Sequence, residues 1–254
     1  MCVKRVPDTG SAIAITDDGM SVDTRRLGFI IGPHEECAVE EAVQIVSAHG
    51  GSVTALTVGP PEADEQLRYA MAIGAGHGVR VETGAEELDA EATARAILRA
   101  VAELASQGRT FDLLLFGNES PDAGHSQVGI RVACELGLPM VAGIKGIEID
   151  TAAGVATLRR DVAAGAEFYE TPLPAAIAVV EGLNLPRYPS MRGRLRAMKA
   201  QLDEVPADVA PGGLRTVGLR QLPHETPRTV VLGTGADSAE AVVDVLEELG
   251  VMPT

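Results

Sequence analysis

Residues 117–129 combine glycines with short polar side chains in a pattern that suits anion binding. They follow an apolar run at 112–116 that is typical of a buried parallel strand, and they lead into a segment with helical apolar spacing. Ligands of open α/β sheets bind where strands end, and the free amides at the start of a helix favour phosphate. The pattern therefore predicts a nucleotide-binding loop between a strand and a helix. A loop that only caps the helix is the alternative.

Three other motifs resemble catalytic or cofactor-binding patterns but lie in the wrong context. Residues 124–128 lack the closing glycine of a nucleophile elbow, because Val128 occupies that position. The glycine-rich run at 74–78 follows a predicted helix, and the run at 233–238 lies too near the end of the chain for a complete dinucleotide-binding unit. We interpret both as helix caps or turns. No acid–base pair or nucleophile emerges, so we expect a protein without catalytic residues of its own.

The histidine and cysteine pattern argues against a metal site and against disulfide bonds. His34 and Cys37 have helical spacing, but no further His or Cys cluster completes a ligand set. The three cysteines, Cys2, Cys37 and Cys134, are odd in number and far apart, which is typical of a reducing, cytoplasmic setting. Cys134 has apolar neighbours on a predicted helix, so we expect it in the core.

The composition predicts a soluble α/β protein with a small-residue core. Of the 254 residues, 46% are hydrophobic but only 3% are aromatic, so Ala, Val, Leu and Ile must fill the interior. This suits parallel strands covered by Ala-rich helices. The net charge of -15 disfavours nucleic acid or an anionic membrane as the main partner. No run of about 18 apolar residues predicts a membrane span, so a protein partner or a small ligand is expected.

The order of the predicted elements indicates a mostly parallel sheet with helices on both faces and antiparallel strands added at one edge. A strand that begins at residue 1 is short for the centre of a sheet, so we expect the start of the chain to be clipped. The predicted strands lie at 1–6, 52–58, 79–81, 112–116, 146–150, 155–161, 167–171 and 175–180, and the predicted helices before Gly50 and at 61–73, 90–106, 127–136 and 194–199.

The chain is expected to divide into a nucleotide-binding domain, residues 1–200, and a linker with an extended C-terminal arm, residues 201–254. Residues 201–222 are rich in Pro, Gly and charge, which is typical of an extended linker. The arm holds a predicted strand at 229–232 and a predicted helix at 238–249. Two such elements cannot bury their own apolar faces, so we expect them to dock on another subunit.

A basic segment, residues 187–199, interrupts the otherwise acidic chain. Tyr188 and Met191 lie there in a loop bracketed by prolines, and such side chains are frequent anchors at interfaces. The segment predicts either a docking loop or a solvated basic face.

Taken together, these stretches resemble the β subunit of electron-transfer flavoprotein, including the related Fix-type subunits. The matching motifs follow the family's order over nearly the whole chain, and the ordered set is more specific than any one motif. They lie at residues 3–8, 36–42, 58–60, 67–68, 71–75, 112–129, 173–175 and 184–190.

The resemblance implies an adenine-nucleotide α-hydrolase-like fold and a heterodimer with an FAD-carrying α subunit. Such a heterodimer accepts electrons from flavin dehydrogenases and delivers them to a quinone reductase or a similar acceptor. The resemblance also implies AMP in this subunit or, in a bifurcating-type member, a second FAD. A stand-alone adenine-nucleotide-binding regulatory protein is the alternative from another class, and the long C-terminal arm disfavours it.

The resemblance also implies site residues. Thr9 and His34 would lie near the partner's flavin, and Arg187, Tyr188 and Met191 in the loop that recognises dehydrogenases. Gly32 departs from the family's usual Asn, and Gly124 with His125 from its usual acidic and small residues. The nucleotide pocket would comprise Cys2, Gly32, Pro33, His34, Glu35, Val58, Gly117, Asn118, Asp122, Gly124, His125, Ser126, Gln127 and Val128.

Overall fold

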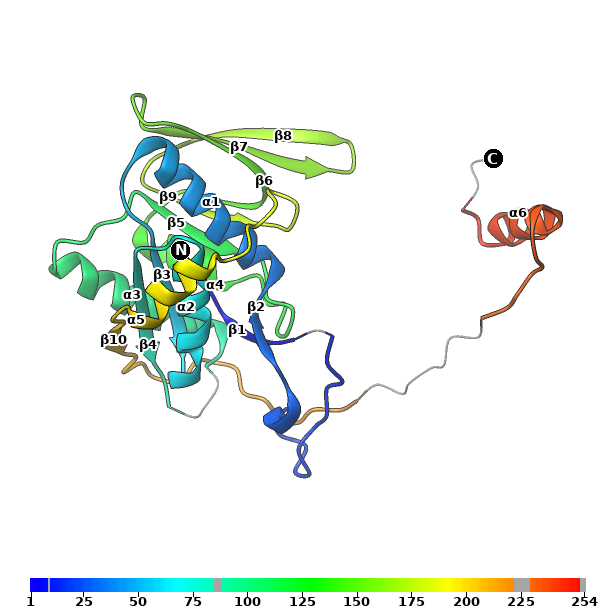
Figure 1. The fold of residues 1–254 in the computed structure, drawn as a ribbon, viewed down its shortest axis with the longest axis horizontal. Helices are drawn as coiled ribbons and strands as arrows, with labels where there is room; N and C mark the ends of the chain where they lie inside the picture. The colour runs from blue at the N-terminus through cyan, green and yellow to red at the C-terminus, as the bar shows by residue number, and fades with distance from the viewer. Residues whose placement is uncertain (9, 85–87, 222–228, 252–254) are drawn as a thin grey trace. The chain divides into compact units, whose positions relative to one another are not determined.

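The computed structural model describes residues 1–8, 10–84, 88–221 and 229–251. The chain divides into two compact units, Met1–Leu219 and Arg220–Thr254, which we call the main unit and the C-terminal unit. The main unit is a layered α/β structure in which helices flank a central sheet (Figure 1). None of the helices in the described ranges combines the length and apolar character needed to cross a membrane.

Hydrogen bonds order most strands of the main unit into a three-stranded and a five-stranded sheet, and two further strands pair separately. The first of these sheets is parallel throughout, whereas in the second the β5, β9 and β6 pairings are parallel and β6, β7 and β8 form an antiparallel extension. In sheet order the strands are β10 (Asp203–Pro206), β4 (His77–Glu82) and β3 (Thr54–Gly59), then β5 (Leu113–Gly117), β9 (Ala175–Val179), β6 (Met140–Asp150), β7 (Val155–Val162) and β8 (Gly165–Pro172).

Residues 1–3 join these two sheets into one. The N–H of Val3 donates to the carbonyl of Leu56 in β3 at 2.8 Å, and the N–H of Cys2 donates to the carbonyl of Leu115 in β5 at 2.9 Å. The strand predicted at 1–6 is therefore divided. Its first residues lie at the centre of the sheet, and β1 (Arg5–Pro7) turns away to pair antiparallel with β2 (Phe29–Ile31).

Helices cover both faces of the sheet, as the alternation of elements predicts. On one face, α1 (Pro33–His49) and α2 (Asp64–Ile73) pack on a core that includes Leu115 and Ile177. On the other face, α3 (Ala90–Ser106) and α4 (Val128–Leu136) pack on the adjacent residues of the same strands, such as Leu114 and Ala176. Successive side chains of a strand point to opposite faces, so β5 and β9 contribute to both cores.

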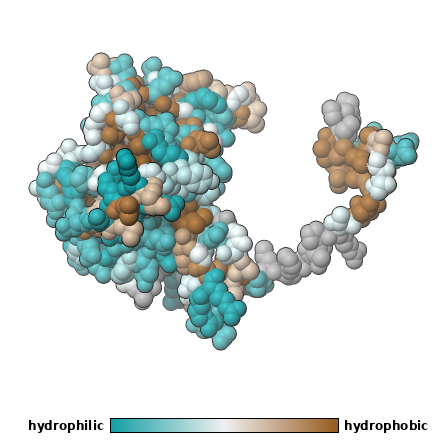
Figure 2. All heavy atoms as spheres, viewed as in Figure 1, coloured by the Kyte–Doolittle hydropathy of each residue, from teal (hydrophilic) through white to brown (hydrophobic). Residues whose placement is uncertain are grey.

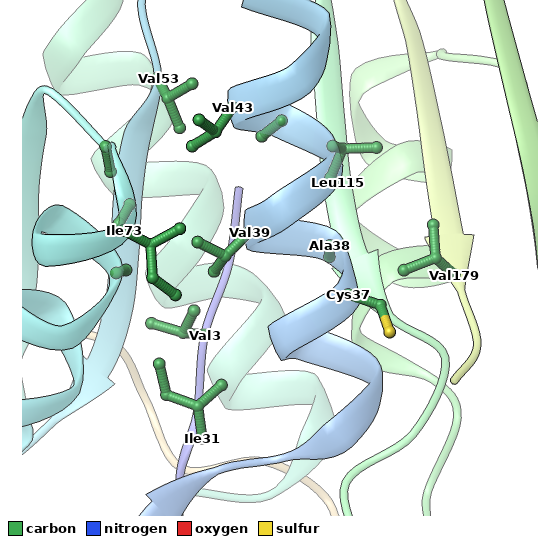
Figure 3. Close-up of a cluster of buried hydrophobic side chains, with 14 of the residues drawn as sticks. Val3, Ile31, Cys37, Ala38, Val39, Val43, Val53, Ile73, Leu115 and Val179 are labelled. Carbon is green, nitrogen blue, oxygen red and sulfur yellow. The ribbon is translucent and has the colours of Figure 1, made fainter. Parts of the chain in front are cut away.

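Small residues allow these layers to approach closely. In Figure 3, Val39 of α1 and Ile73 of α2 point toward one another beside Val3. The prediction of an Ala-rich helix at 90–106 is confirmed by α3, whose Asp89 caps it by accepting the N–H of Ala92 at 2.8 Å.

The prediction that Cys134 is buried is wrong, because Val132 and Ala133 face the core and Cys134 is exposed. Positions two apart lie on nearly opposite sides of a helix.

The segment that the sequence indicated as a linker is largely bound to the main unit. Residues 203–206 form β10, which pairs with β4 and buries Val205. Beyond it, the guanidinium of Arg95 on α3 donates to the carbonyls of Ala210 and Pro211, and Asp89 accepts the N–H of Leu214. Composition alone suggested an extended chain, because the partners of this segment are more than 90 residues away in sequence.

The C-terminal unit contains one α-helix in its described part, α6 (Ala239–Glu248), preceded by a 3-10 turn at Ala236–Ser238. The helix predicted at 238–249 is confirmed. Residues 229–232 form no strand, so that prediction is wrong for this chain alone. A strand requires a neighbour for its backbone groups.

Candidate functional site

The loop after β5 lies directly against the first turn of α1. A methyl group on Gly117 would lie 2.6 Å from Cγ of Glu35 and 3.2 Å from Cβ of His34. Only glycine therefore permits this contact without a shift of the helix or the loop. The structure thus brings together two stretches of the predicted pocket that are more than 80 residues apart in sequence.

Asn118 fixes the inner end of the loop to the sheet. Its backbone N–H donates to the carbonyl of Val179 in β9 at 2.8 Å, and its side-chain Oδ1 accepts the N–H of Gly143 in β6 at 3.1 Å. These two bonds join the loop to β9 and β6. Asn118 therefore holds the loop in place at its root.

Asp122 forms an ion pair with Lys4, which precedes β1. The Lys4 ammonium lies 2.6 Å from Oδ2 of Asp122 and 3.5 Å from Oγ of Ser120. Partial burial alone would raise the pKa of Asp122, but hydrogen bonds from Lys4 and Ser120 and the positive charge of Lys4 lower its pKa overall. Sequence reasoning missed Lys4 because its partner lies 118 positions away, although Lys4 falls within one of the matched motifs at 3–8.

Glu35 is the second acid of this region and is almost completely buried. Its Oε2 accepts the N–H of Gly32 at 2.9 Å, which satisfies one amide at the start of α1. Burial raises the pKa of Glu35 to about 8, and the Gly32 bond and the Lys4 charge offset only part of that rise. Glu35 is therefore mostly protonated at neutral pH.

The contact with Glu35 also requires glycine at position 32. A methyl group there would lie 2.7 Å from Oε2 of Glu35 and 3.1 Å from Cδ of Pro121. The next residue, Pro33, occupies the first helical position, where its missing N–H has no cost. His34 follows, and its buried Nδ1 has no hydrogen-bond partner among the residues that the structure describes.

Cys2 and Val58 are the apolar members of the predicted pocket. Both are partly buried and pack against the core below α3 and α4. Burial raises the pKa of the Cys2 thiol to about 11, with the nearby N-terminal amine lowering it and Glu35 raising it. The thiol is therefore neutral and unreactive at physiological pH.

The outer half of the loop is exposed and leaves the start of α4 uncapped. Gly124 and Ser126 both have positive φ values, 58° and 52°, and the Ser126 hydroxyl donates to Glu119 at 3.1 Å. The Gln127 side chain accepts from Arg131 and does not cap the helix. His125 is exposed and forms no hydrogen bond or ion pair within the described residues. The N–H groups of residues 128–130, beginning with Val128, donate to no group in the described ranges.

The proposed recognition loop, residues 184–191, contains a well-anchored arginine. Both nitrogens on one side of Arg187 contact the carboxylate of Glu40 on α1, with Nη2 to Oε1 at 2.7 Å and Nε to Oε2 at 2.8 Å. Tyr188 and Met191 are 91% and 74% exposed. Arg187 is therefore anchored to α1 while its side chain stays about half exposed, and Tyr188 and Met191 face solvent. Thr9 lies outside the described residues.

No group of three or more His, Cys, Asp or Glu side chains in the described ranges is arranged to hold a metal ion. This edge of the sheet offers hydrogen-bond donors from the loop amides and the positive charge of Lys4. It also holds two acids, Asp122 with a lowered pKa and Glu35 with a raised pKa.

Comparisons with known proteins agree with the resemblance. Residues 19–210 match the family model described as the electron transfer flavoprotein domain. The chain is 33% identical to the electron transfer flavoprotein subunit beta of Bacillus subtilis (strain 168), with 96% of this chain and 95% of the relative covered. It is 38% identical to the protein of that name from Syntrophomonas wolfei, over 78% of this chain and 75% of the relative. The match extends over most of the main unit, and the chain belongs to the electron transfer flavoprotein family.

Proposed function

We propose that this chain is the β subunit of a heterodimeric electron-transfer flavoprotein. In this role it pairs with an α subunit that holds most of the FAD, receives electrons from flavin dehydrogenases, and passes them to a quinone reductase or similar acceptor in the cytoplasm. Membership of the family and the subunit name shared by its relatives support this proposal. The flavin supplies the redox chemistry, and the chain contributes binding and positioning without catalytic residues of its own.

AMP is the nucleotide that this chain binds in the proposal, in the loop at 117–128. The observation that carries this part is the start of α4, whose first N–H groups donate to nothing in the described part of the chain and suit a phosphate. His34 adds a buried ring nitrogen that has no partner among the described residues, while Cys2 and Val58 add apolar surface for a base. Protonation of Glu35 removes one negative charge that would repel the phosphate.

In the proposal the C-terminal unit is an arm that docks on the α subunit, and the segment that begins at residue 201 leads to it. Within this unit, helix α6 has an exposed apolar surface, and Figure 2 shows hydrophobic residues gathered over it. Large exposed apolar surfaces of this kind mark protein-interaction sites. The exposed residues are Val242, Val243, Val245 and Leu249.

The loop that carries Tyr188 and Met191 recognises the dehydrogenase in this proposal. Both side chains are largely exposed, and the neighbouring helix α5 (Met191–Lys199) adds exposed Leu195 and Met198. Met191, Leu195 and Met198 follow helical spacing, so they share one face of α5. An apolar helix face next to an aromatic residue suits a transient protein contact.

The proposal is tested by co-expressing the chain with its genomic neighbour and counting the FAD and AMP released per purified heterodimer. One FAD and one AMP are expected. Two FAD without AMP would identify a bifurcating-type subunit, and the absence of a complex would favour a stand-alone nucleotide-binding protein. Substitution Gly117→Val, which forces a side chain into the first turn of α1, should lower AMP content while FAD content is retained.

A further inference from the structure

Buried acids of α1 anchor the surface loop at 184–191. The Asn184 amide donates to Oε2 of Glu41 at 2.9 Å and to the carbonyl of Cys37 at 3.0 Å. The Cys37 thiol lies 3.7 Å from the carbonyl of Asn184 and completes the contact. Glu41 and Cys37 are 8% and 2% exposed, so the loop begins on a fixed part of the core.

Arg187 forms the second and stronger anchor. Its backbone N–H and its guanidinium both donate to Glu40, a side chain that is only 2% exposed and also accepts from Gln44. Burial alone would raise the pKa of Glu40, but the bonds from Arg187 and Gln44 outweigh burial and lower it. Glu40 is therefore a charged group inside the protein whose principal counterion is a residue of the loop.

The anchored residues alternate with the exposed ones. Leu185 and Tyr188 are 90% and 91% exposed, and each is next in sequence to an anchored residue, Asn184 or Arg187. The side chains of 184 and 187 are held against α1, and Leu185 and Tyr188 lie on the exposed side of the loop, while Pro186 is half-buried. The outward position of the exposed apolar side chains thus depends on the contacts that Asn184 and Arg187 make with α1.

The loop is also fixed at its far end. Ser190 caps α5 by accepting the N–H of Gly193 at 3.0 Å, and a methyl group on Gly193 would lie 2.3 Å from the carbonyl oxygen of Ala72 at the end of α2. Arg196 donates to the carbonyl of Met71 on α2. The loop therefore connects α1 to α2, with both ends held by the core.

We propose that Glu40 and Glu41, acting through Arg187 and Asn184, are positioning residues that order the recognition loop before a dehydrogenase binds. This inference rests on the proposed function of Tyr188 and Met191. Ordering a loop in advance removes an entropic cost that binding would otherwise incur, roughly 0.5–1.5 kcal/mol for each immobilised side chain. Arg187 thus contributes to recognition by holding the loop against Glu40.

Loop order is measured first, in the purified full-length complex. A spin label is placed at residue 191 by Met191→Cys with Cys134→Ser, and its mobility is followed by electron paramagnetic resonance. Glu40→Gln and Arg187→Gln should each increase the mobility of the label, and Arg187→Lys, which keeps the charge but not the fork-shaped contact, should have an intermediate effect. Arg159→Gln is the matched control, because it breaks an exposed Arg–Asp pair on β7 and removes the same charge.

Partner recognition is measured next, with label-free variants that retain Met191. The probe is a purified flavin dehydrogenase, reduced by its own substrate, that transfers electrons to the unmodified heterodimer. Glu40→Gln should raise the KM for the heterodimer by roughly tenfold with kcat and FAD content unchanged, whereas Arg159→Gln should leave all three unchanged.

The outcomes separate this inference from the function on which it rests. An unchanged KM and unchanged label mobility in Glu40→Gln would overturn the positioning role, even with electron transfer intact. Increased mobility with an unchanged KM would show that loop order does not matter for recognition and would also overturn it. Failure of every flavin dehydrogenase to reduce the unmodified heterodimer would instead contradict the proposed function, and the recognition role with it.

Discussion

Two buried glutamates of α1, only five residues apart in sequence, differ in their protonation state. Glu35 is 7% exposed and has a pKa raised to about 8, whereas Glu40 is 2% exposed and has a lowered pKa. Burial raises the pKa of both, but it dominates for Glu35, whereas for Glu40 the bonds from Arg187 and Gln44 outweigh it. Glu40 faces the guanidinium of Arg187, while Glu35 has one backbone amide and a more distant lysine that is paired with Asp122.

The comparison shows how one helix serves two surfaces. At its first turn, a neutral carboxyl allows the loop at 117–128 to approach and leaves room for an anion. One turn further, an ionised carboxylate holds the loop at 184–191. The number of buried acids in a sequence therefore says little about charge until their partners are known.

The largest expected effect is the pH dependence that Glu35 confers on stability. Its pKa is higher in the folded than in the unfolded protein, so its stabilising contribution is complete below the unfolded value and is lost as pH rises toward about 8. At about 1.4 kcal/mol per pKa unit, the free energy of unfolding should fall by about 5 kcal/mol across this range. Urea unfolding between pH 5 and 9 measures it.

Glu35→Gln should flatten this pH profile, because the amide oxygen still accepts the Gly32 N–H but does not titrate. Glu148→Gln, an exposed substitution on β6, serves as the control. An unchanged slope in Glu35→Gln would show that another group titrates.

The next effect tests the opposite member of the pair. Arg187→Ala leaves Glu40 buried without its counterion and should lower the free energy of unfolding by about 2 kcal/mol at pH 7. Because the pKa of Glu40 is lowered in the folded protein, this contribution is present above about 4.3 and is lost as pH falls. Repeating the urea titration at pH 4 should therefore show a smaller loss. An equal loss at both pH values would mean that packing, and not charge, holds the loop.

A smaller effect follows from removal of the cation shared by the two acids near the loop at 117–128. Lys4→Met should cost about 0.5–1 kcal/mol, because the Lys4–Asp122 pair is partly exposed. It should also move the pH midpoint attributed to Glu35 upward, since Lys4 lowers the pKa of Glu35. Lys199→Met on exposed α5 is the comparison. A midpoint that does not move would separate Lys4 from Glu35.

The smallest effect belongs to an ion pair on the surface. Arg25 and Asp23 lie 2.6 Å apart, and hydrogen bonds from Arg25 lower the pKa of Asp23 to about 2. Arg25→Gln should raise the pKa of Asp23, as seen by nuclear magnetic resonance, without a measurable change in the free energy of unfolding. A clear loss of stability would contradict the view that an ion pair must be buried to contribute much to the free energy of unfolding.

The sequence predicted the elements well where local signals were strong. Residues 90–106 form α3 because an Asp cap and an Ala-rich repeat coincide, and the loop at 117–128 lies between a strand and a helix as its pattern indicated. The distant partners of the acids Asp122 and Glu40 could not be predicted in this way. Lys4 and Asp122 are 118 residues apart, and Arg187 and Glu40 are 147 apart, so only the assembled sheet brings them together.

The same reasoning explains the wrong predictions. Apolar side chains at 229–232 suggested a strand, but strand formation depends on a neighbour that local sequence does not reveal. Cys134 was assigned to the core from its neighbours in sequence, although helix geometry places it opposite Val132. The family resemblance corrects neither error, because both depend on which surface a segment packs against.

The late position of β10 in the chain has a consequence for synthesis on the ribosome. β10 pairs with β4, whose last residue precedes it by about 120 positions, and its Glu204 contacts the buried Arg80 at 2.6 Å. Until residues 203–206 emerge, the outer edge of β4 has no strand to cover it and Arg80 lacks that carboxylate. Uncovered strand edges invite association between chains. The nascent protein should therefore be most prone to aggregation after β4 has formed and before β10 closes the sheet.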